Sequence, residues 1–227
     1  MKTVISFEDK KVALLLVDLQ EEQRRDPHYS VFGIDNVLAN AAKLLAAARA
    51  THRLVVHAAY RRDFAQCPPR PFEPVTSEGK PTFSDAVNPL TEICSEVAPR
   101  GSEPVIYKND ASAFCEGNLK PLLNKAQIEW LVIAGVWTEA CVAATVRDGI
   151  AQGFRVLLVK DACGSATSAM HKTAVLNLAN RLYGGAVTDT AGAMDLLDGK
   201  AIPAWVAERP VPILFNFTDA ADRYAEL

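Results

Sequence analysis

The sequence predicts a three-layer α/β/α fold, in which a mostly parallel, doubly wound Rossmann-type sheet lies between two layers of helices. Apolar runs of strand length alternate with segments of helical periodicity, which is the pattern of parallel strands joined by helices. The first run, "VALLLV" at residues 12–17, is apolar throughout, as expected of a strand buried on both faces. A length of 227 residues suits a single domain over residues 1–227.

The other elements follow in a regular order. Strands are expected at 54–60, 104–108, 130–135, 155–162 and 186–190, and helices at 35–50, 89–97, 116–127, 138–152, 167–182 and 192–199. Thr138 stands where it would cap the helix over 138–152, and Gly153 ends that helix. The alternation predicts about six parallel strands joined by right-handed crossovers.

Two segments lack this periodicity. Residues 61–89 contain most of a proline cluster, "CPPRPFEP", and predict a long lid-like loop, because loops of this length in compact domains are usually functional. Residues 201–227 contain Pro203, Pro210 and Pro212 and predict an irregular, extended C-terminal tail that suits packing on a neighbouring subunit.

The composition excludes several classes of protein. The formal charge of −3 and the sequence pI near 5.8 give no reason to expect nucleic acid or an anionic membrane as a partner. No apolar run approaches the roughly 20 residues of a membrane span, and the start "MKTVISFEDKK" lacks the apolar core of a signal peptide. We therefore expect a cytoplasmic protein whose five cysteines are free thiols.

Three reactive side chains follow strands of the predicted sheet. Asp18 and Lys108 end strands, and Cys141 lies in the first turn of the helix after the strand at 130–135. Ligands of parallel sheets bind at the carboxyl ends of the strands, so we expect the three side chains to share one edge. A helical first turn and a nearby lysine favour the thiolate, and a carboxylate can accept a proton during attack. The set predicts a nucleophile that attacks a carbonyl carbon.

Each residue has an ordinary alternative when taken alone. A cysteine among alanines and valines is most often a small core residue, and an aspartate after a strand often only shapes a turn. Lys108 would ordinarily be a solvated strand end. The conjunction of the three favours chemistry over these alternatives.

The segments around these residues resemble a known family. "ALLLVDLQ", "VIYKNDASAFCEGNLKPLL" and "VIAGVWTEACVAATVRDGIAQGFRVLLVKDACGS" are similar, in order and spacing, to the signature blocks of the isochorismatase-like cysteine hydrolases. This superfamily includes nicotinamidases, N-carbamoylsarcosine amidohydrolases, and biuret and ureidoacrylate amidohydrolases. The resemblance runs from about residue 11 to residue 197 and implies an Asp18, Lys108 and Cys141 triad, and assembly as a homodimer or homotetramer.

The resemblance also implies further site residues. A cis peptide between Val136 and Trp137 would turn the Trp137 N–H inward, where it joins the Cys141 N–H as an oxyanion hole. Gln20 and Phe114 match family positions that would contact substrate. We also expect substrate contact from Tyr60, at the start of the lid-like loop, and from Trp137, whose position is commonly small in the family. For Gln20 the alternative is a bond to local backbone, and for Phe114 and Trp137 it is the core.

The start of the lid-like loop offers a further possibility. Arg61 or Arg62, between Tyr60 and Phe64, would suit a substrate carboxylate through bidentate hydrogen bonds. The alternative is a solvated, charged edge of the protein.

The histidines argue against one branch of the family. Nicotinamidases hold a metal with an aspartate and two histidines after the second strand, whereas here that segment contains only His57. His28, His52 and His171 are widely separated and give no metal-ligand spacing. We therefore expect no metal and no cofactor.

The resulting expectation is an amidohydrolase that cleaves a small carboxamide, carbamoyl or ureido C–N bond through a thioester and releases ammonia or an amine. One alternative is vinyl ether hydrolysis of the isochorismatase type, which does not require the cysteine. A second is a redox-sensing thiol protein on the same scaffold, which would need Cys115 or Cys163 as a resolving thiol.

Overall fold

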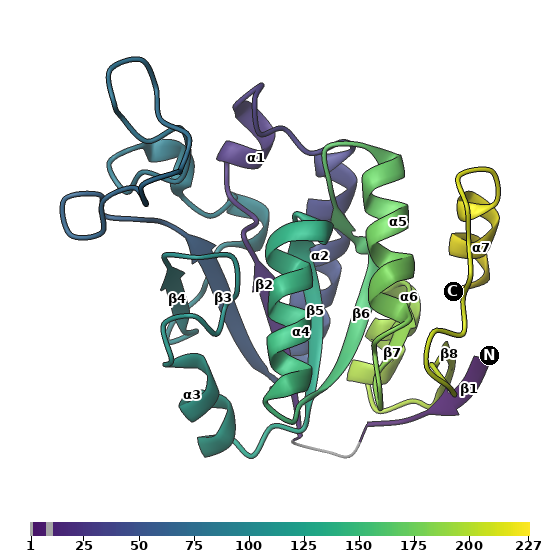
Figure 1. The fold of residues 1–227 in the computed structure, drawn as a ribbon. Helices are drawn as coiled ribbons and strands as arrows, with labels where there is room; N and C mark the ends of the chain where they lie inside the picture. The colour runs from purple at the N-terminus through teal and green to yellow at the C-terminus, as the bar shows by residue number, and fades with distance from the viewer. Residues whose placement is uncertain (1, 8–10) are drawn as a thin grey trace.

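The computed structural model, which describes residues 2–7 and 11–227, has one eight-stranded sheet with helices on both faces (Figure 1). The strand order is β1-β8-β7-β6-β5-β2-β3-β4. The strands are β1 (Lys2–Ile5), β2 (Val12–Val17), β3 (Leu54–Tyr60), β4 (Val105–Lys108), β5 (Trp130–Val136), β6 (Arg155–Gly164), β7 (Ala186–Thr188) and β8 (Ile202–Trp205). The six strands β2 to β7 are mutually parallel, which confirms the predicted α/β/α sheet.

The helices form two layers that bury opposite faces of the sheet. Helices α2 (Ile34–Ala50) and α6 (Thr190–Leu197) pack on one face, and α3 (Leu119–Lys125), α4 (Ala143–Ala151) and α5 (Ser168–Ala179) pack on the other. A short helix, α1 (Glu22–Arg25), lies apart from these layers (Figure 1), and α7 (Ala220–Glu226) packs against α5. Single turns form at Pro89–Thr91 and Ser95–Val97.

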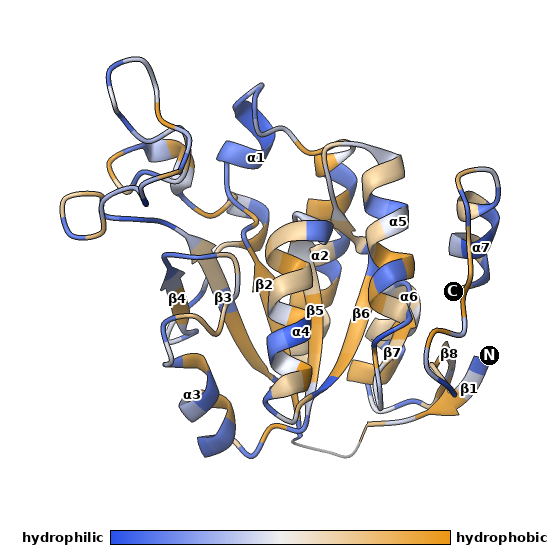
Figure 2. Ribbon diagram, viewed as in Figure 1, coloured by the Kyte–Doolittle hydropathy of each residue, from blue (hydrophilic) through white to orange (hydrophobic). Residues whose placement is uncertain are grey.

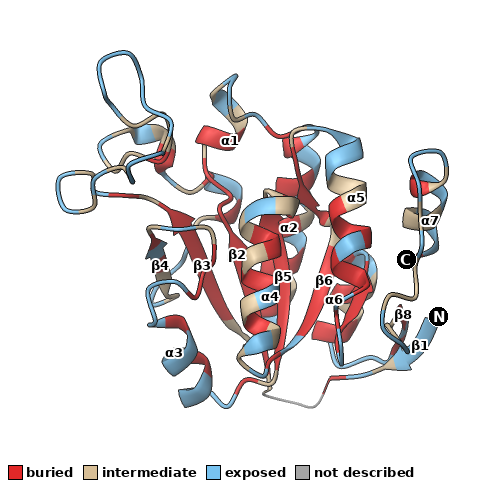
Figure 3. Cartoon of the chain, viewed as in Figure 1, coloured by how far each residue is buried: buried red, intermediate tan, exposed pale blue. Residues whose placement is uncertain are grey.

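Strand β2 shows why a continuous apolar run is needed in the central strands. Its alternate residues Val12, Leu14 and Leu16 join the core under α2, while Leu15 and Val17 join the core on the opposite face. Both faces are therefore dry, and the central strands are apolar and buried along their length (Figures 2 and 3).

Strands β2 and β5 approach closely at the edge where the predicted site lies. Gly135 has a φ of 138°, and a Cβ there would meet the Val17 carbonyl oxygen at 2.0 Å. Only glycine fits this position, since any side chain would push apart the strand ends that precede Asp18 and Trp137.

The ends of the chain differ from the prediction. Strand β8 pairs antiparallel with β1, and helix α7 forms near the C-terminus, so the tail over 201–227 is not irregular throughout. Proline at position 203 suggested an irregular segment, but it is tolerated because β7 pairs with β8 only at Trp205, so Pro203 has a paired neighbour on one side alone. Four-residue strands and a seven-residue helix carry too little periodicity to be read from the sequence.

No helix within the described part of the chain is long and apolar enough to cross a membrane.

Candidate active site

The structure brings Asp18, Lys108 and Cys141 together at the carboxyl edge of the sheet. Asp18 directly follows β2, Lys108 ends β4, and Cys141 lies in the turn after β5. The Lys108 Nζ atom lies 2.8 Å from Asp18 Oδ2, and both side chains act on the pKa of the Cys141 thiol. Strand ends that are distant in sequence thus converge, as the parallel topology predicted.

Lys108 is held as a buried cation. Its side chain has no exposed surface, its ammonium donates to the Asp110 carbonyl oxygen at 3.1 Å, and it lies 4.2 Å from the centroid of the Tyr60 ring. Burial is the largest single effect and opposes protonation, but the charge of Asp18, the Cys141 sulfur and the hydrogen bonds to both together outweigh it, so the pKa of Lys108 is raised. The lysine therefore carries its positive charge beside Asp18 and Cys141.

Asp18 is positioned with one oxygen free. Its φ is 52°, in the left-handed region, and its N–H donates to the Ala58 carbonyl at 2.9 Å. Oδ2 is paired with Lys108, whereas the buried Oδ1 accepts no hydrogen bond from any residue described in the structure. Burial raises the pKa of this carboxyl more than Lys108 lowers it, which makes Asp18 a stronger base than an exposed aspartate.

The surroundings of Cys141 favour the neutral thiol over the thiolate. Burial, followed by the charge of Asp18, raises the pKa of the thiol, and Lys108 only partly offsets this. Lys108 thus acts in the expected direction and lowers the pKa of the thiol, but burial and the charge of Asp18 together raise it by more. The sequence could not show how deeply the sulfur is buried, and desolvation outweighs the favourable charges.

The turn that carries Cys141 also differs from the prediction. Residues Thr138–Val142 form a π-helical turn that continues into α4. Thr138 does not cap it: its hydroxyl donates to the Gly164 carbonyl at 2.9 Å and lies 2.9 Å from His171 Nδ1. The threonine instead links the turn to β6 and α5. Widened turns of this kind often occur at functional sites.

A cavity of about 420 Å³ opens beside Cys141. It is lined by Asp18, Glu22, Gln23, His28, Tyr29, Tyr60, Phe83, Ser84, Ala111, Val136, Trp137, Ala140 and Cys141. Its volume suits a small molecule. Asp18 and Cys141 therefore both lie on the wall of a cavity of that size.

Two of the four predicted substrate-binding residues line this cavity. The Tyr60 ring packs edge-on against Phe83, with centroids 5.6 Å apart. The Trp137 indole N–H donates to Gln23 Oε1 at 2.6 Å, while the ring also packs against the core. The Val136–Trp137 peptide bond is cis, at the position that the resemblance implied.

The other two residues lie elsewhere. Gln20 is fully buried; its amide donates to the carbonyls of Tyr60 and Thr91, and its oxygen accepts the Tyr60 N–H at 2.9 Å. Phe114 stacks on Phe154, with centroids 5.9 Å apart, within the core. Neither lines the cavity, so the assignment of both to substrate binding is corrected: Gln20 holds backbone, and Phe114 fills the core.

Several lining residues were not identified from the sequence. Glu22 and Gln23 lie one turn beyond Asp18, on α1, and Phe83 and Ser84 come from the lid-like loop. Tyr29 packs against Phe83, with centroids 5.5 Å apart. The stretch "EEQ" after Asp18 was a usable signal, because it follows the same strand end. The loop residues carried no signal, since tertiary contacts determine their placement.

The arginines at the start of the lid-like loop are occupied by acidic partners. Arg61 pairs with Glu92 at 3.1 Å, and Arg62, with only 3% of its side chain exposed, pairs with Glu73 at 2.7 Å. Neither arginine lines the cavity. The suggestion that one of them binds a substrate carboxylate is therefore not supported by the geometry.

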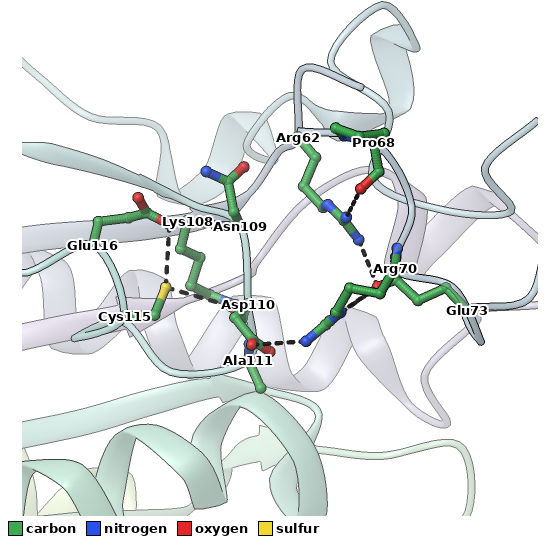
Figure 4. A network of polar contacts seen from close by, with 10 residues as sticks. All are labelled: Arg62, Pro68, Arg70, Glu73, Lys108, Asn109, Asp110, Ala111, Cys115 and Glu116. Atoms are coloured by element: carbon green, nitrogen blue, oxygen red, sulfur yellow. Dashed lines mark hydrogen bonds and ion pairs between the residues drawn. The ribbon is translucent and has the colours of Figure 1, made fainter. Parts of the chain in front are cut away.

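The lid-like loop is tied to the segment that follows Lys108 (Figure 4). Arg70 pairs with Glu73 and, at 2.9 Å, with Asp110 Oδ2. Asp110 is also the residue whose carbonyl accepts the Lys108 ammonium. A short chain of polar contacts thus runs from the loop to Lys108.

Within residues 2–7 and 11–227, no group of three or more histidine, cysteine, aspartate or glutamate side chains is arranged to hold a metal ion.

The chain belongs to the isochorismatase family, because the model of the isochorismatase domain matches residues 12–192. It is 34% identical over 183 residues to the maleamate amidohydrolase of Pseudomonas putida, covering 79% of this chain and 84% of that protein. It is 28% identical over 193 residues to the N-carbamoylsarcosine amidase of an Arthrobacter species, covering 82% and 71%.

Solved structures share the fold. An isochorismatase family protein from Desulfovibrio vulgaris aligns with a TM-score of 0.74 at 24% identity, over 83% of this chain and 98% of that chain. A cysteine hydrolase from Pseudomonas syringae aligns with a TM-score of 0.71 at 18% identity, over 86% and 95%.

Proposed function

We propose that this protein is an amidohydrolase that uses Cys141 as its nucleophile to cleave a small carboxamide, carbamoyl or ureido C–N bond. Membership of the isochorismatase family, with relatives named as a maleamate amidohydrolase and an N-carbamoylsarcosine amidase, supports hydrolysis of amide bonds. The observation that carries the proposal is the 2.8 Å Lys108–Asp18 pair at a cavity that Cys141 also lines.

The first half of the proposed reaction forms a thioester. Asp18 Oδ1 takes the proton of the Cys141 thiol while the sulfur bonds to the carbonyl carbon. The backbone N–H groups of Trp137 and Cys141 stabilise the tetrahedral oxyanion, and fixed donors of this kind contribute about 3 kcal/mol each. The C–N bond then breaks, and the leaving amine or ammonia takes the proton from Asp18.

The second half hydrolyses the thioester. Asp18 takes a proton from water, the resulting hydroxide attacks the thioester carbon, and the C–S bond breaks. The sulfur recovers the proton from Asp18 as the acid product leaves. Lys108 keeps its charge throughout and stabilises the negative charge that moves between Asp18 and Cys141.

A neutral resting thiol fits this scheme. Because burial raises the pKa values of both Cys141 and Asp18, the proton has to move between them at the moment of attack. The free Oδ1 of Asp18 is the acceptor that such a transfer requires. The pair would therefore act in the manner of a nucleophile with an adjacent general base.

The two alternative functions have less support. Vinyl ether hydrolysis would leave Cys141 without a role. A redox sensor would need a second thiol near Cys141, but neither Cys115 nor Cys163 lines the cavity. We also propose that the chain forms a single hydrolase domain in the cytoplasm, covered by the loop over 61–89, and assembles as a homodimer or homotetramer without a metal or cofactor.

The test is a product screen of the wild-type protein. Small carboxamides, N-carbamoyl amines and ureas are assayed for ammonia release, and vinyl ethers are assayed in parallel for the carbonyl product. Ammonia from at least one amide class, with no vinyl ether turnover, is the expected result. Vinyl ether turnover without ammonia would overturn the proposal.

A further inference from the structure

Glu22 is a second buried acid of the cavity that the proposed reaction does not use. It lines the cavity from the first residue of α1, and only 1% of its surface is exposed. Oε1 accepts the Ser84 N–H at 2.9 Å, and Oε2 accepts the Ser84 hydroxyl at 3.2 Å. These contacts fix the carboxylate in place and leave each oxygen able to accept a second hydrogen bond.

The surroundings of Glu22 supply no positive charge. Among the residues that the structure describes, its oxygens bond only to Ser84. Burial raises its pKa, and the carboxylates of Asp26 and Asp18 raise it further. A buried carboxylate without a cation is costly, so a ligand that brings positive charge or N–H donors would relieve this cost.

The rest of the cavity does not suit an anionic ligand. Neither lysine nor arginine is among its lining residues, and its one histidine, His28, lies with Nδ1 3.2 Å from the Asp26 carboxylate. The Lys108 ammonium is already engaged by Asp18 and by the Asp110 carbonyl. Arg61 pairs with Glu92, and Arg62 pairs with Glu73 of the loop. A substrate carboxylate would therefore enter a space walled by two acids, with no free cation to meet it.

We propose that Glu22 selects substrates whose end distal to the scissile amide is a hydrogen-bond donor, either an ammonium or an uncharged carboxamide or ureido group, over substrates that end in a carboxylate. This inference rests on the proposed function and narrows its substrate class. It sets the chain apart from an enzyme for maleamate, which carries a carboxylate. Glu22 acts here as a specificity residue and takes no part in bond cleavage.

The test compares three amides of matched length that differ only at the distal end. These are 4-aminobutanamide with an ammonium, succinamide with a carboxamide, and succinamate with a carboxylate. Ammonia release gives kcat/KM for each, counted per carboxamide. We expect wild-type protein to prefer the ammonium and carboxamide compounds over succinamate by at least about tenfold, because hydrogen bonds to a charged group and like-charge repulsion act together.

The variant Glu22→Gln tests the residue itself. It keeps the shape of the side chain and removes the charge, so the preference for the ammonium compound over succinamate is expected to fall by about tenfold. Glu208→Gln, the same change on the exposed tail outside the cavity, serves as the control and retains the wild-type ranking. The order of the three amides by kcat/KM is measured on the wild-type protein, so it tests the inference even if Glu22→Gln does not fold.

Binding separates this inference from the proposed function. The three compounds are titrated by NMR into Cys141→Ala and into Cys141→Ala/Glu22→Gln. We expect Cys141→Ala to bind the ammonium and carboxamide compounds more tightly than succinamate, and the double variant to lose this preference. This result supports the inference whether or not turnover is seen. The inference would be overturned if succinamate were bound or turned over as well as the other two amides. It would also be overturned if Glu22→Gln kept the wild-type preference. Absence of ammonia from every amide contradicts the proposed function instead.

Discussion

The ammonium of Lys108 and the carboxylate of Asp18 form a 2.8 Å ion pair in which neither side chain is more than 4% exposed. The pair has no solvent to screen it, so its charges act strongly on the Cys141 thiol beside it. This relationship organises the proposed chemistry, because Lys108 fixes one oxygen of Asp18 and leaves the other to exchange a proton with sulfur.

Removal of the Lys108 charge is expected to suppress the reactivity of Cys141. In Lys108→Met the thiol keeps its burial but loses the cation that lowers its pKa. The pH profile of iodoacetamide alkylation at Cys141 should move upward by about one pH unit or more. Lys80→Met, an exposed lysine of the lid-like loop, is the matched control. An unchanged alkylation profile in Lys108→Met would contradict the electrostatic role of Lys108.

The activity is expected to require ionised Asp18. Burial raises the pKa of Asp18, and the base works only when deprotonated, so kcat/KM should fall as the pH drops through this raised pKa. The acid limb should therefore lie above the ordinary aspartate range of about 4. Circular dichroism over the same range separates this effect from unfolding. An acid limb at or below about pH 4 would contradict the role of buried Asp18.

His171 predicts how stability depends on pH. Burial lowers its pKa to about 4, so it stays neutral in the folded protein while it binds a proton in the unfolded chain below about pH 6.5. The free energy of unfolding should therefore fall on acidification from about pH 6.5 toward pH 4, by at most about 3 kcal/mol from this group.

Urea unfolding at about pH 7 and about pH 5 measures this dependence. His171→Gln removes this ring and should reduce the difference between the two pH values, while the contribution of His57, whose pKa burial also lowers, remains. His52→Asn changes an exposed histidine and should leave the difference as in the wild type. An equal pH dependence in His171→Gln and the wild type would show that another group is responsible.

The Arg70–Asp110 ion pair is expected to restrain the lid-like loop. Arg70→Ala removes the 2.9 Å contact that links the loop to the segment after Lys108. The pair is half-exposed and contributes at most about 1 kcal/mol, so global stability should change little. Local opening should increase, and chymotrypsin should cleave several-fold faster after Phe72, which is exposed on this loop.

Lys80→Ala provides the comparison for this experiment. It removes the Lys80–Glu78 ion pair, which lies within the same loop and does not reach Asp110. Its cleavage rate should match that of the wild type. Equal rates in Arg70→Ala and Lys80→Ala would mean that the contact to Asp110 does not hold the loop.

The convergence of the reactive residues could be predicted because it follows from topology. The carboxyl ends of parallel strands meet at one edge of the sheet, so the sequence alone was enough to place Asp18, Lys108 and Cys141 together. The β8 strand could not be placed, because four residues that include Pro203 carry almost no periodicity.

The residues that line the cavity and the protonation state of the Cys141 thiol could not be predicted from the sequence. Phe83 and Ser84 reach the cavity through contacts of a long loop, whose course no local pattern specifies. Glu22 was within reach of the argument, since it follows the same strand end as Asp18. The state of Cys141 depends on its depth of burial, which became visible only in three dimensions and reversed the expected direction of its pKa.

The role of Cys141 is tested most directly by the rate of ammonia release from the best amide substrate in Cys141→Ala, measured beside Cys115→Ala. Cys115 is exposed and lies outside the cavity, so Cys115→Ala should keep the wild-type rate. Loss of the nucleophile should lower kcat by about 10³-fold or more, with the fold intact by circular dichroism. Ammonia release from Cys141→Ala at a rate comparable to Cys115→Ala would contradict the proposed mechanism.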